Sequence, residues 1–220
     1  MLPCTRTGPI EVAPFTEAEQ TDAVEKVHSA LDRVTLGNNH GAVVGIGGTA
    51  RTGTKVKVIR ALLAAHGEGG TLFDVGCGFR HMMLAALTTG FDGACGCDLP
   101  DNAVQRQIID SAKAQLRIDP DTLCEWIGTN VMELVLPERL SRRITAVYSF
   151  WNGIGPDPQR RTLELCRDTL VNVRSVAVYL DKGWTPTTGM AAIQFTFSIM
   201  IPSITQSLIV FFTTSSCSSQ

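Results

Sequence analysis

The residues with the clearest chemical meaning lie in a short glycine-rich stretch, LFDVGCGFR, at positions 72–80. An apolar run leads to the acid Asp74, and Gly76 and Gly78 follow at alternate positions. Glycine permits a tight turn and leaves no Cβ in the path of a ligand that approaches the backbone. Where such a turn joins a buried strand to a helix, the free N–H groups of the helix can bind a nucleotide-like cofactor. The stretch therefore predicts a cofactor loop.

A second acid lies at the distance that such a loop requires. Asp98 lies near the end of the stretch GACGCDL, twenty residues after Gly78. At the end of the next strand, a carboxylate can accept hydrogen bonds from the hydroxyls of a ribose. Either feature alone fits a plain strand-to-helix turn. Together, the glycine-rich loop and Asp98 have the residue types, the order and the separation along the chain that a nucleotide-binding site requires. We therefore expect a cofactor that contains a nucleoside.

The loop differs from the dinucleotide pattern GxGxxG, because residues 76–81, GCGFRH, lack its third glycine. Asp74 would repel a pyrophosphate but would attract a cofactor with an ammonium and a sulfonium group. S-adenosylmethionine carries both groups, and an NAD(P)-linked oxidoreductase is the alternative enzyme class. We expect Arg80 to face solvent or to pair with a carboxylate, and His81 to lie on the helix surface.

Two strings, LFDVGCGFR and GCDLPDNAV, resemble the first two motifs of the class I S-adenosylmethionine-dependent methyltransferases. Asp74, Gly76 and Gly78 match the family's acid-x-Gly-x-Gly-x-Gly motif, in which Arg80 replaces the last glycine. Asp98 matches the ribose-binding acid of the second motif. The resemblance implies a methyltransferase whose cofactor is S-adenosylmethionine. A degenerate methyltransferase fold that acts as a non-catalytic binding module is the alternative outside the enzymes.

The resemblance also implies further contacts to the cofactor. In the third motif, WIGTNVMEL, Thr129 or Asn130 would be the polar contact near the adenine. In the fourth motif, YSFWNGIGP, Asn152 would hold the acceptor or merely cap a turn. Of Phe150 and Trp151, one would line the site and the other would pack in the core. The candidate cofactor-binding residues are Asp74, Gly76, Cys77, Gly78, Asp98, Leu99, Thr129, Asn130 and Phe150, and the candidate catalytic residues are Asn152 and Trp151.

Within this superfamily the chain is loosely similar to the disruptor-of-telomeric-silencing group of histone lysine methyltransferases. Residues 47–49, GGT, are similar to a Gly-Glu-Thr-like loop of that group. Residues 150–166, FWNGIGPDPQRRTLELC, are similar to its asparagine-aromatic-Gly-Pro segment and the helix after it. The resemblance implies a protein lysine as one acceptor, with a small molecule as the other.

Composition narrows the class of partner and the compartment. The 220 residues carry a net charge of −2, so no basic field favours bulk nucleic acid as the acceptor. The seven cysteines are odd in number and contain no CxxC pair, which indicates reduced thiols in an intracellular protein of the cytoplasm or nucleus. The same pattern predicts neither a disulfide framework nor a metal site.

The periodicity of apolar residues predicts the elements that position these side chains. Strands are expected at 71–75, 93–99, 123–128, 144–151 and 175–180, and helices at 16–36, 55–66, 80–89, 101–117 and 157–171. A short connecting helix or turn is expected at 133–140. A glycine-rich loop is expected over 37–54. Alternation of strand and helix predicts an α/β fold with a doubly wound, mostly parallel sheet of the Rossmann-like methyltransferase type, preceded by a helical extension.

Three regions follow from this pattern. Residues 1–46 form an N-terminal extension with one helix, 47–184 a methyltransferase-like catalytic domain, and 185–220 an apolar tail. Strict alternation over 193–199 predicts that the tail supplies closing antiparallel strands. A membrane anchor over 190–212 and a non-native end are the alternatives.

Overall fold

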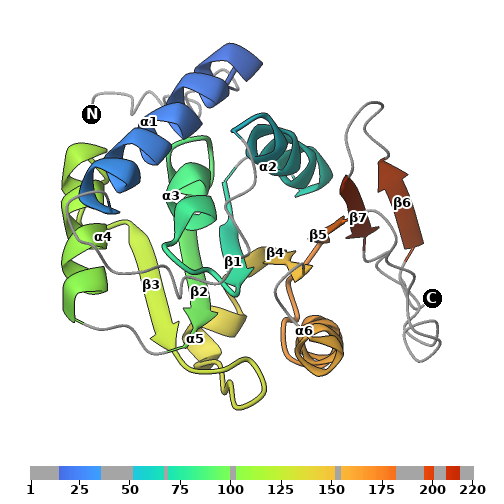
Figure 1. Ribbon diagram of the computed structural model, residues 1–220. Helices are drawn as coiled ribbons and strands as arrows, with labels where there is room; N and C mark the ends of the chain where they lie inside the picture. Colours follow the sequence, from blue (N-terminus) through green and yellow to red (C-terminus); the bar gives the residue numbers. More distant parts are fainter. Residues whose placement is uncertain are drawn as a thin grey trace, which may run out of the picture.

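The computed structural model describes residues 15–35, 52–66, 69–99, 103–151, 155–181, 196–200 and 207–213 (Figure 1). The helices in these ranges are α1 (Glu17–Thr35), α2 (Thr52–His66), α3 (His81–Leu87), α4 (Ala103–Gln115), α5 (Glu138–Ser141) and α6 (Pro156–Asp168). The strands are β1 (Thr71–Val75), β2 (Gly93–Asp98), β3 (Leu123–Gly128), β4 (Ile144–Phe150), β5 (Ser175–Asp181), β6 (Thr196–Met200) and β7 (Ser207–Thr213).

The strands form one sheet in the order β3-β2-β1-β4-β5-β7-β6. The neighbours from β3 to β5 are parallel, whereas β7 is antiparallel to both β5 and β6. The strand order reverses between β1 and β4, and ligands in open α/β sheets bind beyond the carboxyl ends of the strands at such a point. The predicted doubly wound, mostly parallel α/β fold is confirmed.

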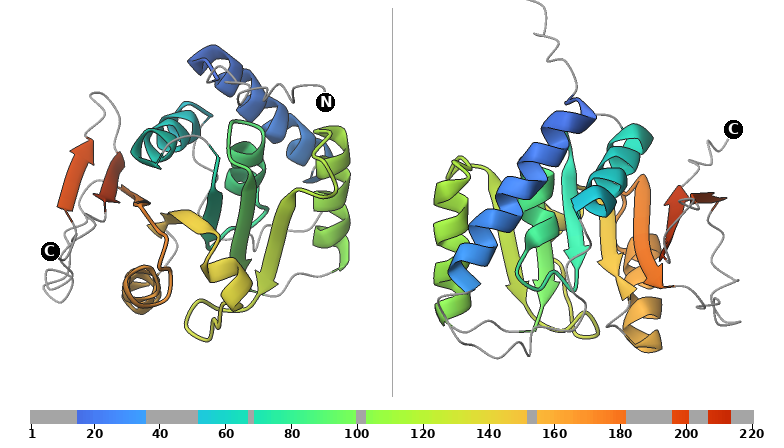
Figure 2. Two further views of the ribbon diagram at one scale, coloured as in Figure 1. Left: turned by 180° about the vertical axis from the view of Figure 1, so that it is seen from behind. Right: turned by 45° about the horizontal axis from the view of Figure 1, so that its top comes forward.

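Helices cover both faces of the sheet (Figures 1 and 2). On one face Leu72 of β1 packs with Ile59 of α2 in a core that also contains residues of α1 and α3. On the other face Phe73 of β1 packs with Leu163 of α6. Because both faces are covered, every residue of β1 is buried, including the polar Thr71 and Asp74.

Element bounds agree with the sequence wherever apolar periodicity is strong. β1 and β3 have the predicted bounds, 71–75 and 123–128. The segment predicted over 133–140 as a short helix or turn contains both, because a turn ends at Glu133 and α5 begins only after Pro137. Proline lacks an N–H donor and disfavours the helical conformation in the residue before it, so a helix cannot run through this position.

The N-terminal helix begins with a capping box formed by Thr16 and Glu19. The Thr16 N–H donates to Glu19 Oε2 at 2.8 Å, and the Glu19 N–H donates to Thr16 Oγ1 at 3.3 Å. This reciprocal pair satisfies two N–H groups that the first turn of α1 leaves without a helical partner. α2 begins earlier than predicted, at Thr52, inside the region expected to be a glycine-rich loop.

The tail contributes two strands to the edge of the sheet. β7 pairs with β5 over seven residues, from Ser175 opposite Thr213 to Asp181 opposite Ser207, and β6 pairs with β7. The described part of 190–212, the alternative membrane anchor, is therefore strand. Among the described residues, no helix is both long and apolar enough to cross a membrane. The domain borders at 46/47 and 184/185 lie outside the described residues and stay predictions.

Gly96, in the middle of β2, lies where β1, β2 and α3 pack most closely. A Cβ at this position would be 2.8 Å from Met83 Sδ and 2.9 Å from the Asp74 carbonyl oxygen. Gly96→Ala should therefore lower the free energy of unfolding in urea by about 1–3 kcal/mol, the usual cost of overpacking. Gly155→Ala is the matched control, because no atom lies within 4 Å of its added Cβ. Equal stabilities of the two variants would contradict this packing.

Candidate functional site

The turn between β1 and α3 has an unusual backbone. Gly76, Gly78 and Arg80 have φ angles of 78°, 47° and 60°, so left-handed residues occur at every second position. The N–H groups of Gly76 and Cys77 both donate to the Cys97 carbonyl oxygen, at 2.9 and 3.2 Å. Left-handed φ angles cost little only for glycine, which explains the two glycines of the motif. No atom lies within 4 Å of a Cβ built on Gly78, so the loop is open to a ligand there.

Asp98, at the end of β2, contacts this loop directly. Its Oδ2 accepts a hydrogen bond of 2.6 Å from the Gly78 N–H, and its Oδ1 accepts one of 2.7 Å from the Leu99 N–H. The two sequence features that predicted a cofactor are thus in contact. Because a carboxylate oxygen has two lone pairs, each oxygen can still accept a hydrogen bond from a hydroxyl group.

The sequence predicted that Arg80 faces solvent or pairs with a carboxylate, and the first of these alternatives is wrong. Only 3% of its surface is exposed, its guanidinium carbon lies 4.6 Å from the centroid of the Trp126 ring, and its Nη1 donates to the Gly78 carbonyl oxygen at 3.4 Å. The left-handed turn directs the side chain toward β3, where Trp126 lies. Stacking of the cation on the indole offsets the strain that this backbone conformation imposes on an arginine.

Asp74 is buried at the end of β1, with 2% of its surface exposed. Burial, and then the nearby negative charge of Asp98, raise the pKa of its carboxyl group to about 8. The positive charges of Lys55 and Arg80 act in the opposite direction on this pKa but do not outweigh burial. Near neutral pH the free protein therefore holds a largely protonated acid behind the loop.

A group of basic side chains from three helices lies on the same face. Lys55 of α2 is 3% exposed, and its Nζ lies 2.9 Å from His28 Nε2 of α1. A charged ammonium group can only donate, so His28 accepts at Nε2 and carries its own proton on Nδ1. The rings of His28 and His81 lie 5.3 Å apart. This group connects the N-terminal helix to the end of β1.

His81 was expected on the helix surface, and this is wrong. It is half-buried against His28. Burial, followed by the electrostatic effects of Lys55 and His28, lowers the pKa of His81 to about 3, which leaves a neutral imidazole. Sequence reasoning missed His28 and Lys55, because they lie on helices far apart in the chain and no motif marks them.

Other predicted cofactor-binding residues lie at the same carboxyl edge of the sheet. Leu99 follows β2, and 62% of its surface is exposed, which is unusual for a large apolar residue. Such a side chain could contact the adenine ring of the predicted cofactor. Thr129 is half-buried and Asn130 is exposed after β3. The Met132 N–H donates to Asn130 Oδ1 at 3.0 Å. Cys77 is buried within the loop, and burial raises the pKa of its thiol well above the usual value.

The residues predicted from the fourth motif separate onto two faces. Phe150 is half-buried and stacks on Tyr179, with ring centroids 4.7 Å apart. Trp151 is 3% exposed and packs with Leu163 in the core under α6. Trp151 is therefore a core residue, and its assignment as a catalytic residue is not supported. Asn152, the other catalytic candidate, lies outside the described residues.

Known proteins resemble this chain in structure but not in sequence. No family model and no curated protein matches it. Magnesium protoporphyrin IX methyltransferase from Synechocystis PCC 6803, solved with bound S-adenosylmethionine, is 14% identical at a TM-score of 0.55, covering 93% of this chain and 100% of that one. A TehB-like S-adenosylmethionine-dependent methyltransferase from Corynebacterium glutamicum is 14% identical at 0.51, covering 87% and 98%. The methyltransferase domain of a bacterial Hen1 protein is 12% identical at 0.53, covering 72% and 96%.

These likenesses show that the chain has the Rossmann-like α/β fold of the class I methyltransferases. The looser resemblance to the histone lysine methyltransferase group finds no support among them.

The stacking of Arg80 can be separated from its backbone strain, because Arg117 also has a left-handed φ, 55°, but is exposed. Replacing either arginine with glycine relieves the strain, whereas only Arg80→Gly loses the Trp126 stack. Arg80→Gly should therefore be less stable than Arg117→Gly by about 1–2 kcal/mol in urea unfolding. Equal effects of the two changes would show that the stack contributes nothing.

The raised pKa of Asp74 predicts how stability depends on pH. Between the unfolded value of 3.8 and the folded value of about 8, the folded state binds more protons than the unfolded state. The free energy of unfolding therefore falls as pH rises through this range, by at most about 1.4 kcal/mol per pH unit. Asp74→Asn should flatten the slope in urea titrations from about pH 5 to about pH 7. Asp121→Asn removes an exposed carboxylate and should not; an unchanged slope in Asp74→Asn would contradict burial of the acid.

Proposed function

We propose that this protein transfers the methyl group of S-adenosylmethionine to an acceptor. The observation that carries the proposal is the contact between Asp98 and Gly78, at the carboxyl edge of β1 and β2. It joins an acid suited to ribose hydroxyls with a loop suited to a ligand that lies against the backbone. The fold, which is that of solved methyltransferases, supports the same reading.

The donor groups around the loop fit this cofactor in kind. Asp98 has free lone pairs for the two ribose hydroxyls, and the exposed side chain of Leu99 offers an apolar surface for the adenine. Thr129 and Asn130 follow the neighbouring strand and would contact the adenine from its polar side. The loop at Gly78 is open where the methionine part would lie.

Asp74 fits the charge of the cofactor. A bound ammonium group favours the ionised form of a nearby carboxyl group, so binding would lower the raised pKa of Asp74 and release a proton. A pyrophosphate would instead raise this pKa further. The acid behind the loop therefore favours S-adenosylmethionine over a dinucleotide.

The chemical demands on the protein are then modest. The sulfonium group supplies a methyl group that is already activated for transfer. The residues of this chain need to hold the acceptor atom in line with that methyl group and to exclude water. We assign the acceptor side of the site to the end of β4, where Phe150 lies and Asn152 follows.

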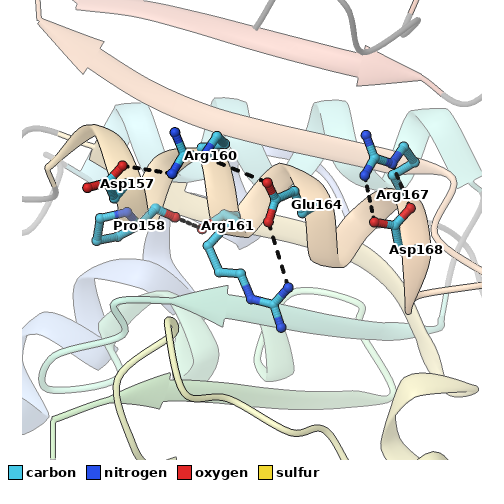
Figure 3. Close-up of polar contacts among 8 residues, drawn as sticks. Asp157, Pro158, Arg160, Arg161, Glu164, Arg167 and Asp168 are labelled. Carbon is cyan, nitrogen blue, oxygen red and sulfur yellow. Dashed lines mark hydrogen bonds and ion pairs between the residues drawn. The ribbon is translucent and has the colours of Figure 1, made fainter. Parts of the chain in front are cut away.

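Charge pairing on α6 bears on the class of acceptor (Figure 3). Arg160 lies 2.9 Å from Asp157 and 3.7 Å from Glu164, and Arg161 lies 3.7 Å from Glu164. The basic pair on this helix is thus compensated and offers little to a phosphate backbone. A protein or a small molecule is the more suitable acceptor, and the similarity of residues 47–49 and 150–166 to histone lysine methyltransferases makes a protein lysine the first candidate to test.

Asp98→Ala should abolish binding of S-adenosylhomocysteine in calorimetry, or weaken it by at least about tenfold, since a charged hydrogen-bond acceptor is lost. Asp92→Ala is a closely matched control. Asp92 also accepts a hydrogen bond from a glycine N–H, that of Gly70 at 3.2 Å, but at the opposite edge of the sheet. Its loss should leave cofactor affinity unchanged.

Two further results would overturn the proposal. Unchanged affinity of Asp98→Ala for S-adenosylhomocysteine would contradict the assignment of the site. Tight binding of a nicotinamide cofactor, with no binding of S-adenosylmethionine, would favour the oxidoreductase instead. Formation of S-adenosylhomocysteine during incubation with candidate acceptors separates an active enzyme from a non-catalytic binding module.

A further inference from the structure

Lys55 is a charged residue to which the proposed site assigns no role. Only 3% of its surface is exposed, and its Nζ lies 2.9 Å from Nε2 of His28. Lysine is rarely buried to this extent, because removing an ammonium group from water costs free energy. Charges interact more strongly away from solvent, so a buried ammonium group acts on any ionisable group near it.

The stripe of α2 that contains Lys55 faces β1. Lys55, Ile59 and Leu62 follow one another at spacings of four and three residues, and all three are buried. Ile59 packs with Leu72 of β1. Asp74 lies two residues after Leu72, so its side chain points to the same face of the sheet. Lys55 and Asp74 therefore share one interface, between α2 and β1.

The direction of α2 brings Lys55 to the carboxyl end of β1. Toward the C-terminal end of the helix, Leu63 Cδ1 lies 3.3 Å from a Cβ built on Gly90, which precedes β2. Toward the N-terminal end, Lys55 contacts His28, whose ring lies 5.3 Å from that of His81, the first residue of α3. Lys55 therefore lies at the edge of the sheet that carries the cofactor loop.

Lys55 is also the cation with the larger effect on Asp74. Burial and the charge of Asp98 raise the pKa of Asp74, whereas the charge of Lys55, followed by that of Arg80, lowers it. The other titratable groups around Asp74 are neutral near pH 7, because burial raises their pKa values. These groups are the thiols of Cys77, Cys95 and Cys97 and the phenol of Tyr148.

We propose that Lys55, which His28 holds in place, is a positioning residue for the cofactor acid: its charge allows Asp74 to ionise when a cationic group of the ligand binds. The inference rests on the proposed function, because that function supplies the cationic group. Without Lys55, the ligand alone would have to overcome the burial of Asp74 and the charge of Asp98. With Lys55 in place, the folded protein supplies part of that free energy before the ligand arrives.

Titration of Asp74 in the free protein tests this role without a ligand. The carboxyl carbon is followed by NMR of protein labelled at aspartate, and Asp74→Asn assigns the signal. The wild type should titrate near pH 8. In Lys55→Met the midpoint should rise by at least about one pH unit, because an opposite charge is lost. Methionine is an unbranched chain that adapts to its surroundings, so this change removes the charge and keeps the packing.

Two variants control for this titration. Lys57→Met removes an exposed lysine from the same helix and should titrate like the wild type. Lys55→Arg keeps the positive charge and should restore most of the wild-type midpoint. Equal midpoints in Lys55→Met and Lys57→Met would overturn the inference.

A double-mutant cycle on the binding of S-adenosylhomocysteine, measured near pH 7, tests the coupling to the ligand. Lys55→Met should weaken binding by about tenfold in the protein that keeps Asp74, since a rise of one unit in pKa makes ionisation of the acid ten times less favourable. In the Asp74→Asn background the same change should not weaken binding, because no acid remains to ionise. An equal loss in both backgrounds would show a structural role or a direct contact, and would overturn the inference.

Failure of this inference differs from failure of the proposed function. Absence of S-adenosylhomocysteine binding to the wild type would contradict the proposed function. The titration of Asp74 in the free protein would still decide for or against the role of Lys55.

Discussion

The hydrogen bond from the Gly78 N–H to the carboxylate of Asp98 is the interaction on which the site depends. It connects the turn after β1 to the end of β2, and it can form only because the backbone passes through left-handed conformations at Gly76 and Gly78. The same turn donates two further N–H groups to the Cys97 carbonyl oxygen. The start of α3, the open side of the loop and the orientation of Asp98 all follow from this junction. A ligand that binds here meets a surface that is already arranged, so it loses less free energy to ordering the protein.

Burial of Asp74 places a second constraint on the same turn. A carboxyl group without solvent prefers to be neutral, and the cations around it only partly offset that preference. Lys55 and His28 bring two N-terminal helices into contact with this region, so the helical extension is part of the environment of the loop. Binding of a cationic group would therefore alter the balance of charge shared by β1, α1 and α2. The extension therefore contributes to the electrostatic environment of Asp74 as well as covering one face of the sheet.

The sequence predicted the features that depend on local pattern, but not those that depend on contacts between helices and strands far apart in the chain. The bounds of β1 and β3, the fold class and the pairing of the loop with Asp98 all follow from apolar periodicity and from a fixed separation along the chain. The burial of Arg80 depends on Trp126, which lies on β3, and the burial of His81 depends on His28 of α1. Neither neighbour is adjacent in sequence, so neither could be paired with its partner before the structure was known. The segment before β4 was predicted only as a short helix or turn, and Pro137 determines where its helix begins.

Arg80 illustrates why a glycine motif is better understood as a backbone requirement than as a pattern of letters. The residue keeps the left-handed conformation that a glycine would adopt at this position, with φ 60° and ψ 24°. The turn is therefore preserved, and the strain of about 1–2 kcal/mol is offset by a cation–π contact of similar size. The substitution also changes the chemistry, because it places a fixed positive charge between the loop and the Trp126 ring. Loss of the third glycine thus does not argue against a cofactor loop; it adds a charged wall that a glycine could not provide.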